Sequence, residues 1–393
     1  MTTATRNIRR TRLIYSVFLS LLVYSCQTWP SGSPGLTSSA QSENKNKAQP
    51  AVFTPAWKSI LGPRDYLSHT QGFSGGVALH DRRPLLLTVG FDGILSFRQR
   101  YTGTLLWSTP LGAPGVGLPI FEKDIAYIPT DDGILSAYDI QKRKVIWKQQ
   151  FSGLVSAPLT LYKKLIIVSD GTNSLYAIDR ESGGYRWQKK GNPPKDFSYH
   201  GESRPLIVNH RLYMGFSDGT IACFDADSGR ERWRKDLATE VNQFQDVDAD
   251  PLISRGVLYA ASAASGIYAL KPEDGQQLWF YPQAGVITLS EFEGDLIVGL
   301  QSGEVGRFDP RERRFIWKVS FGTDGAPSRP LRFPHALMIS LSRGGLYIID
   351  PDTGALRDQF NPGNGILAPL TLSEDGWLYA TSLSGHLYAF APR

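Results

Sequence analysis

Cysteine, methionine and histidine are scarce in this chain of 393 residues, which has two, three and six of them, respectively. The two cysteines, Cys26 and Cys223, are too few for a disulfide framework or for a zinc site built from four thiolates. The histidines show no spacing typical of metal ligands, and neither a phosphate-binding loop nor a nucleophile motif is evident. The sequence therefore indicates no catalytic centre, cofactor site or metal site of a familiar kind.

An apolar run long enough to cross a membrane is also lacking near the N-terminus. Residues 13–23 are largely apolar, but a helix that spans a bilayer needs about 20 such residues. Four arginines between residues 6 and 12 precede this run, and no acidic residue accompanies them. A basic stretch followed by a short apolar stretch is typical of a secretory signal peptide.

The apolar run ends in Val23-Tyr24-Ser25-Cys26, which resembles the lipobox of bacterial lipoproteins, whose cysteine is lipidated and becomes the first residue. We therefore expect a signal peptide over 1–25 and lipidation at Cys26. Gln27 stands where lipoproteins of the inner membrane typically carry Asp, which favours anchoring in the outer membrane. An ordinary signal peptide followed by a chance cysteine is the alternative. If Cys26 is lipidated, Cys223 has no disulfide partner and is expected to be a small core residue.

A strong charge of one sign is lacking as well. The formal net charge is +5, and the four arginines of the signal peptide account for most of it. We therefore expect no strong nonspecific attraction to nucleic acid or to anionic lipid. Residues 26–50 are rich in Ser, Gly, Pro, Asn and Gln, and this composition predicts a flexible tether after the lipidated cysteine.

The rest of the chain repeats one pattern, in which a tight turn with glycine is followed by an alternating apolar strand. A period near 40 residues is typical of a β-propeller, in which each repeat forms one four-stranded blade. We therefore predict an all-β fold over 51–393, an eight-bladed β-propeller with four-stranded antiparallel blades. The repeated turns contain Gly93, Gly133, Gly171, Gly219, Gly266, Gly303, Gly345 and Gly385.

An aromatic residue marks the last strand of seven repeats, but the eighth repeat ends before such a strand. The orphan Trp57 precedes the first repeat. We therefore expect the N-terminal segment over 52–60 to supply the outer strand of the last blade and to close the ring, which removes open sheet edges. The seven aromatic residues are Trp107, Trp147, Trp187, Trp233, Trp279, Trp317 and Phe360.

A second type of turn contains clustered acids, as in Asp179–Gly183 and Asp225–Gly229. These turns could be mistaken for calcium-binding loops. An aspartate that caps its own turn explains the pattern equally well, and six oxygen ligands do not gather in any of them. We therefore expect capped turns and no metal.

The pattern from Gly171 to Trp187 resembles the repeats of quinoprotein dehydrogenases, which bind pyrroloquinoline quinone (PQQ). The resemblance implies the propeller scaffold. Those enzymes also need an adjacent cysteine pair above the quinone, and this chain has no such pair. We therefore expect the scaffold without the cofactor, because one fold hosts several functions. A quinoprotein-like oxidoreductase with a rebuilt site is the alternative.

Two consecutive connections between blades are longer than the others. From the blade aromatic to the proline that opens the next strand, both Trp187 to Pro205 and Trp233 to Pro251 span 18 residues, compared with 9 to 13 elsewhere. In a propeller of such blades these connections emerge on one face, so the two long ones are neighbours. Long loops on a rigid scaffold are common binding sites.

The same two connections resemble those of the BamB family, lipidated eight-bladed propellers of the outer-membrane β-barrel assembly machinery. The resemblance rests on Gly-Glu-Ser-x-Pro at 201–205 and Asp-Val-Asp-x-x-Pro at 246–251. In that family these loops dock on a periplasmic POTRA domain of BamA. Carried over by position, apolar contacts fall on Phe197 and Tyr199, and polar contacts on His200, Asp246 and Asp248.

Two features beside the first motif depart from the family pattern. The family's leucines are replaced by the aromatic Phe197 and Tyr199, which keeps an apolar anchor but changes its shape. His200 stands where the family has arginine, so any ion pair with the aspartates would be weaker at neutral pH. The alternative role for Asp246 and Asp248 is structural, as groups that cap and tie their own loop.

Together these observations predict a noncatalytic scaffold lipoprotein on the periplasmic side of the bacterial outer membrane. The implied partner is a BamA-like subunit, and nascent outer-membrane proteins are a further candidate. We expect no cofactor, no metal and no nucleic acid. Besides the oxidoreductase, the remaining alternative is a binding propeller, for example for carbohydrate, that is unrelated to barrel assembly.

Overall fold

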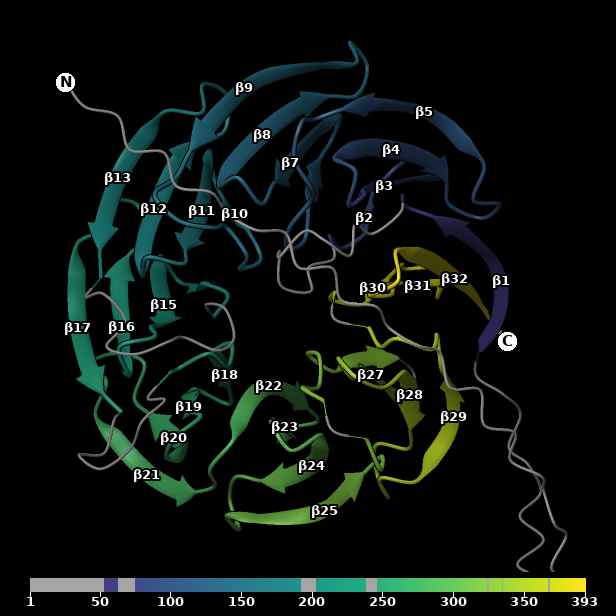
Figure 1. Cartoon of the computed structure of the whole chain (residues 1–393). Helices are drawn as coiled ribbons and strands as arrows, with labels where there is room; N and C mark the ends of the chain where they lie inside the picture. The colour runs from purple at the N-terminus through teal and green to yellow at the C-terminus, as the bar shows by residue number, and fades with distance from the viewer. Residues whose placement is uncertain are drawn as a thin grey trace, which may run out of the picture. The chain divides into compact units, whose positions relative to one another are not determined.

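The structure is a computed structural model, and it describes residues 53–62, 75–191, 203–237, 246–323, 325–333, 335–366 and 368–393. These residues belong to the compact unit Gln49–Arg393. They form eight four-stranded sheets in a ring, and neighbouring strands are antiparallel (Figure 1). The predicted eight-bladed β-propeller is confirmed.

Blades 1 to 4 are built from consecutive strands of the chain. Their strands are β2 (Ala78–Leu79), β3 (Leu85–Val89), β4 (Ile94–Gln99), β5 (Leu105–Pro110), β6 (Ile120–Glu122), β7 (Ile125–Pro129), β8 (Ile134–Asp139), β9 (Lys144–Gln150), β10 (Thr160–Tyr162), β11 (Leu165–Asp170), β12 (Ser174–Asp179), β13 (Tyr185–Lys190), β14 (Leu206–Val208), β15 (Arg211–Gly215), β16 (Thr220–Asp225) and β17 (Glu231–Asp236).

Blades 5 to 7 continue in the same way, and blade 8 combines the two ends of the propeller. Their strands are β18 (Leu252–Ser254), β19 (Val257–Ser262), β20 (Gly266–Leu270), β21 (Gln277–Pro282), β22 (Val286–Phe292), β23 (Asp295–Leu300), β24 (Glu304–Asp309), β25 (Arg314–Ser320), β26 (Leu331–Phe333), β27 (Ala336–Ser340), β28 (Leu346–Ile349), β29 (Leu356–Phe360), β30 (Thr371–Leu372), β31 (Leu378–Thr381), β32 (His386–Pro392) and β1 (Phe53–Ile60).

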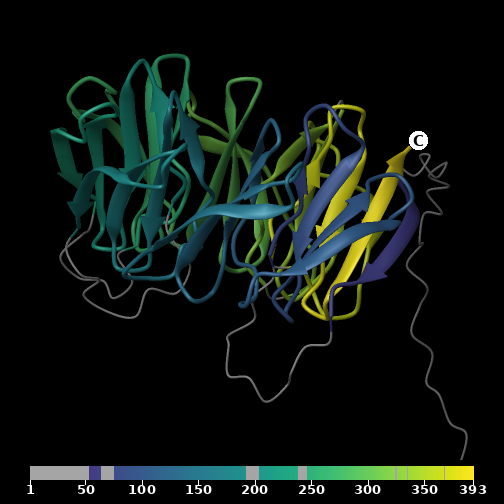
Figure 2. The same cartoon turned by 90° about the horizontal axis from the view of Figure 1, so that it is seen from above.

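Burial along each blade follows from how the blades pack. The middle strands β11 and β12 are buried at nearly every position, because both faces of a blade contact neighbouring blades. The outer strand β13 alternates between exposed and half-buried residues, because only one of its faces points inward. Figure 2 shows the blades edge-on, with the strands running between the two faces of the ring.

Glycine at positive φ forms the tight turn between the second and third strands of most blades. Gly93 (φ 70°) and Gly133 (φ 76°) each donate a backbone hydrogen bond across this turn. In blade 3 the prediction was wrong in detail, because Asn173 (φ 65°) occupies this position and Gly171 lies two residues earlier. Asparagine tolerates the left-handed region better than most residues do. In blade 7 it was also wrong in detail, because Gly344 donates across the turn to Leu341 and Gly345 has no positive φ.

Tryptophan in an outer strand contacts the turn between the last two strands of the next blade. The indole N–H of Trp147 donates to the carbonyl of Arg180 at 3.0 Å, and its ring lies against Gly183, where a Cβ would meet it at 2.6 Å. The same hydrogen bond joins Trp57 to Arg100, Trp233 to Pro272 and Trp317 to Pro351. We call this contact the interblade latch.

Two blades replace the turn glycine by arginine and keep the contact in another form. Arg143 (φ 52°) lies over the ring of Trp107 at 4.8 Å, and Arg313 (φ 54°) lies over Trp279 at 5.8 Å. A guanidinium over an indole is a favourable cation–π arrangement.

Ring closure explains why the seventh aromatic residue is phenylalanine. The outer strands of blade 8, β32 and β1, come from opposite ends of the chain, so no turn joins them and no turn carbonyl faces blade 7. Phe360 needs no hydrogen-bond donor there and packs on Tyr388 and Phe390. The predicted closing strand is confirmed, and Trp57 lies in it opposite Ala389.

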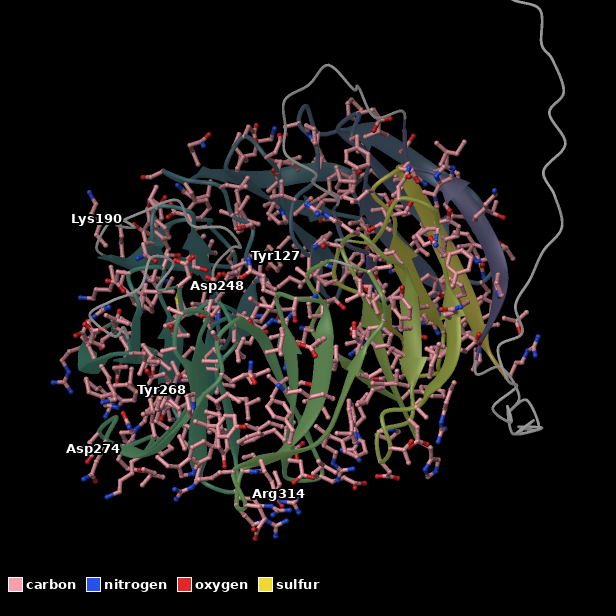
Figure 3. All side chains as sticks on the ribbon, turned by 60° about the horizontal axis from the view of Figure 1, so that its bottom comes forward. Tyr127, Lys190, Asp248, Tyr268, Asp274 and Arg314 are labelled. Atoms are coloured by element: carbon pink, nitrogen blue, oxygen red, sulfur yellow. The ribbon has the colours of Figure 1, made fainter. Side chains whose placement is uncertain are left out.

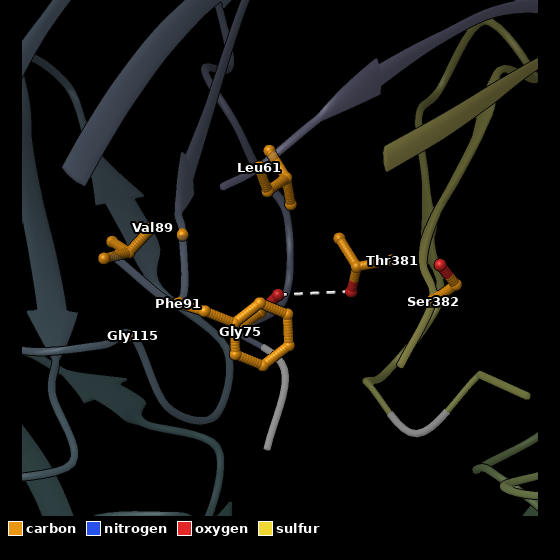
Figure 4. A pocket seen from close by; sticks show the side chains of 8 residues that line it. Leu61, Gly75, Val89, Phe91, Gly115, Thr381 and Ser382 are labelled. Atoms are coloured by element: carbon orange, nitrogen blue, oxygen red, sulfur yellow. Dashed lines mark hydrogen bonds between the residues drawn. The ribbon is translucent and has the colours of Figure 1, made fainter. Parts of the chain in front are cut away.

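Further contacts seal the seam between blades 8 and 1. The Tyr379 hydroxyl donates to the carbonyl of Arg100 at 3.1 Å, and the Arg100 guanidinium pairs with Asp375 at 3.0 Å. The Thr381 hydroxyl donates to the carbonyl of Gly75 beside a cavity of about 10 Å³ (Figure 4). That volume holds at most one water molecule, so the seam is closely packed.

The interblade latch at the seam can be tested at Gly103, where a Cβ would meet the Trp57 ring at 2.6 Å. Gly103→Ala should lower the free energy of unfolding by about 1–3 kcal/mol more than Gly322→Ala does. Gly322 has nearly the same positive φ (69° compared with 71°), but a Cβ there meets no atom within 4 Å, so it controls for backbone strain. Urea unfolding measures the difference, and equal effects of the two substitutions would show that the latch contributes little.

Candidate functional site

The two long connections leave the ring on one face. The first joins β13 to β14 and the second joins β17 to β18, and we call the face that carries them the connection face. The structure describes their ends, residues 191 and 203–205 of the first and residues 237 and 246–251 of the second. Phe197, Tyr199 and His200 lie outside the described residues, as does Cys26.

The described ends of the two connections contact each other. The backbone N–H of Arg204 donates to Oδ1 of Asp250 at 2.7 Å. Ser203 is fully buried, accepts from the N–H of Gly215 at 2.8 Å and donates to the carbonyl of the same residue at 3.1 Å. These bonds fix the end of the first connection to β15 and to the end of the second, as expected for neighbouring loops.

Asp246 and Asp248 differ in how accessible they are. Asp246 is only 6% exposed, and its carbonyl accepts from the N–H of Ala263 at 3.0 Å. Its neighbour Val247 is buried in a hydrophobic cluster of blades 4 and 5. Asp248 is half-buried. The burial of Asp246 favours the structural role for this residue, and Asp248 is the better candidate for a partner contact.

Asp248 lies far from the turns at the opposite ends of the blades. Figure 3 labels it together with Asp274 and Arg314, which lie in or directly after turns between the third and fourth strands of blades 5 and 6. These turns belong to the face opposite the connection face. Substitutions at Asp274 or Arg314 therefore provide controls that leave the connection face unchanged.

The acid-rich turns between the last two strands are capped by their own aspartates, as predicted. Oδ1 of Asp179 accepts from the N–H groups of Glu181 and Ser182, and Oδ2 accepts from Arg186 at 2.8 Å. The Arg186 guanidinium and the Ser182 N–H lower the pKa of Asp179 to about 2. Both carboxylate oxygens of Asp179 are therefore engaged within the chain.

The described residues contain neither a metal-binding cluster nor a membrane-spanning helix. Among them, no three side chains of His, Cys, Asp or Glu are grouped so that they could hold a metal ion. Within the same ranges, no helix has the length and apolar character needed to cross a bilayer. Cys223 is fully buried as predicted, and burial raises the pKa of its thiol to about 11.

The sequence interpretation missed one charged group on the connection face. Asp250 accepts from Arg329 at 3.2 Å as well as from the N–H of Arg204. Each of these three residues directly precedes a proline that opens an innermost strand: Pro205, Pro251 or Pro330. That shared position before proline is a signal which could have identified the group.

The architecture belongs to the class of eight-bladed propellers with PQQ-type repeats. A quinohemoprotein alcohol dehydrogenase from Comamonas testosteroni has a similar structure, with a TM-score of 0.67 and 13% identity over 86% of this chain and 76% of its own. The structure of BamB from Moraxella catarrhalis is also similar, with a TM-score of 0.73 and 20% identity over 86% of this chain and all of the other. At these identities the likeness shows the fold alone.

The sequence comparison defines the family. The family model described as outer membrane protein assembly factor BamB matches residues 55–143 and 91–319, which together cover more than half of the chain. An outer membrane protein assembly factor BamB from Yersinia pestis is 24% identical over 98% of this chain and 99% of its own length. The chain therefore belongs to the BamB family, as the two loop motifs indicated.

The contribution of the capped turn to stability can be tested through its pH dependence, because the pKa of Asp179 lies below its ordinary value near 4. Ionised Asp179 then stabilises the fold above about pH 4, and this contribution is lost as the pH falls through 2. Asp179→Asn should lower the free energy of unfolding by about 2 kcal/mol at pH 7, and by less as the pH approaches 2.

Asp274→Asn is the matched control, since the Asp274 carboxylate accepts a single hydrogen bond from the Gln276 N–H in an exposed turn. It should change stability by less than about 0.5 kcal/mol. Urea unfolding at several pH values measures both variants. A pH-independent effect of Asp179→Asn would contradict the assignment of the charge as the stabilising feature.

Proposed function

We propose that this chain is a noncatalytic scaffold lipoprotein of the outer-membrane β-barrel assembly machinery, anchored through Cys26 on the periplasmic side. It binds a periplasmic POTRA domain of a BamA-like subunit and thereby assists the folding and insertion of outer-membrane proteins. The observation that carries the proposal is the family match over residues 55–319, which includes both long connections.

The geometry of the connection face supports this role. The hydrogen bond between Arg204 and Asp250 holds the C-terminal ends of the two connections together. Phe197 and Tyr199 supply apolar side chains on one connection, and Asp248 supplies a carboxylate on the other. An apolar anchor beside a polar orienting group is the usual composition of a binding hot spot.

A buried role for Asp246 refines the proposed interface. Truncating a residue that is only 6% exposed changes the loop itself before it changes any partner contact. We therefore assign the partner contacts to Phe197, Tyr199, His200 and Asp248, with Asp246 holding the second connection in place.

The interface is tested by measuring the affinity for purified POTRA domains of the BamA-like protein from the same bacterium. Tyr199→Ala and Asp248→Ala should each weaken binding by about 5- to 100-fold, because hot-spot truncations cost roughly 1–3 kcal/mol. Circular dichroism and the melting temperature should stay unchanged. Asp246→Ala should instead lower the melting temperature.

Leu278→Ala and Asp274→Ala are matched controls, because Leu278 is exposed on the outer strand β21 and Asp274 lies on the opposite face. Both should bind the POTRA domains like the wild type. If Tyr199→Ala and Asp248→Ala are folded and bind with unchanged affinity, the partner uses another surface of the propeller.

The anchor is tested separately with the two cysteines of the chain. Cys26→Ala should give a protein that no longer fractionates with the membrane and no longer enters the detergent phase on extraction. The reason is that the lipid chains on Cys26 hold the mature protein in the membrane. Cys223→Ala is the matched control and should remain in the membrane fraction, since this residue is buried in the propeller. Equal membrane retention of both variants would contradict the lipoprotein assignment.

A further inference from the structure

An open cavity of about 660 Å³ lies between the innermost strands of blades 3 and 4. One wall comes from β10 and the other from β14, together with the residues that flank these strands. Leucine, isoleucine and proline side chains form the apolar part of its wall, and Arg204 is among the polar residues that form the rest. The lining residues are Leu159, Thr160, Leu161, Tyr162, Arg204, Pro205, Leu206, Ile207, Asn209 and His210.

Asp250 gives the Arg204 side chain only a partial counter-charge, because it also pairs with Arg329. Both oxygens of Asp250 already accept other hydrogen bonds, Oδ1 from the backbone N–H of Arg204 and Oδ2 from the Arg329 guanidinium. Within the described part of the chain, Nε of Arg204 is buried and has no hydrogen-bond partner. Burial lowers the pKa of Arg204, and Arg329 lowers it further, against the opposing effect of Asp250.

The charges of Arg204, Arg329 and Asp250 do not cancel. Two guanidinium groups and one carboxylate leave one positive charge at the edge of the cavity. A partly buried cation whose counter-charge is shared with a second cation is unfavourable, and a bound anion removes that penalty. One additional negative charge would balance the group.

We propose that Arg204, flanked by Arg329, binds the carboxylate of a small organic monocarboxylate whose apolar part lies against Leu161, Leu206 and Ile207. The planar guanidinium matches a carboxylate in geometry, and a single negative charge matches the single excess positive charge. The apolar wall favours a ligand with a hydrocarbon body over a hydrated inorganic anion. This site is separate from the proposed partner contacts.

Sodium hexanoate is a suitable probe, because it combines one carboxylate with a short hydrocarbon chain. Isothermal titration of the purified protein should show saturable binding at one site. Neutral 1-hexanol and inorganic phosphate are the ligand controls, and both should bind at least tenfold more weakly. Equal binding of 1-hexanol would show that the charge is not recognised, and preferred binding of phosphate would show that the apolar wall is not used. Either result overturns the proposal.

Two substitutions change the site in opposite directions. Arg204→Gln should weaken hexanoate binding by about 10- to 100-fold, because a charge-assisted hydrogen bond is lost. Asp250→Asn keeps an acceptor for the Arg204 N–H but removes the competing negative charge, so hexanoate should bind several-fold more tightly. Arg314→Gln, at the opposite end of blade 6, should have no effect.

The Asp250→Asn variant keeps the test decisive if Arg204→Gln does not fold, because a purely structural Asp250 would not predict tighter binding. Circular dichroism identifies folded variants. No saturable binding of hexanoate to the wild type, or wild-type affinity in folded Arg204→Gln, would overturn the monocarboxylate site. The effect of Tyr199→Ala on capture of the POTRA domains tests the partner interface independently, because this variant changes none of the lining residues of the cavity named above.

Discussion

The contact between an outer-strand aromatic side chain and a turn of the next blade is the interaction on which the propeller depends. Trp147 makes both parts of this contact: its indole N–H donates to the carbonyl of Arg180, and its ring packs against Gly183. The indole fixes both the distance and the rotation between adjacent blades, because the N–H and the ring face contact different atoms of one turn. The arginines that replace glycine in blades 2 and 6, and Phe360 in blade 7, follow from the same constraint.

The interblade latches and the long connections lie at opposite ends of the blades. The latches involve turns between the third and fourth strands, whereas the connections begin after the fourth strand. A connection can therefore lengthen or change its residues without loss of the packing that closes the ring. This separation gives a physical reason why one propeller scaffold serves both quinohemoprotein dehydrogenases and the BamB family.

The connection face combines two kinds of polar group with different roles. Ser203 and Asp246 are buried and hold the connections to the sheets. Arg204 lines an open cavity and shares the single carboxylate of Asp250 with Arg329. Rigid anchoring beside an incompletely neutralised cation is the arrangement from which we infer a ligand site next to the proposed partner interface.

The sequence alone determined the number of blades, the four-stranded repeat and closure by the strand around Trp57, because these features depend on local periodicity and on the count of aromatic residues. It also indicated the capped turns. The tertiary structure alone decided that Asn173 takes the place of a turn glycine, that Asp246 is buried, and that Asp250 joins Arg204 to Arg329. Asp250 is 46 residues from Arg204 and 79 from Arg329, so only the curvature of the closed ring brings the three together.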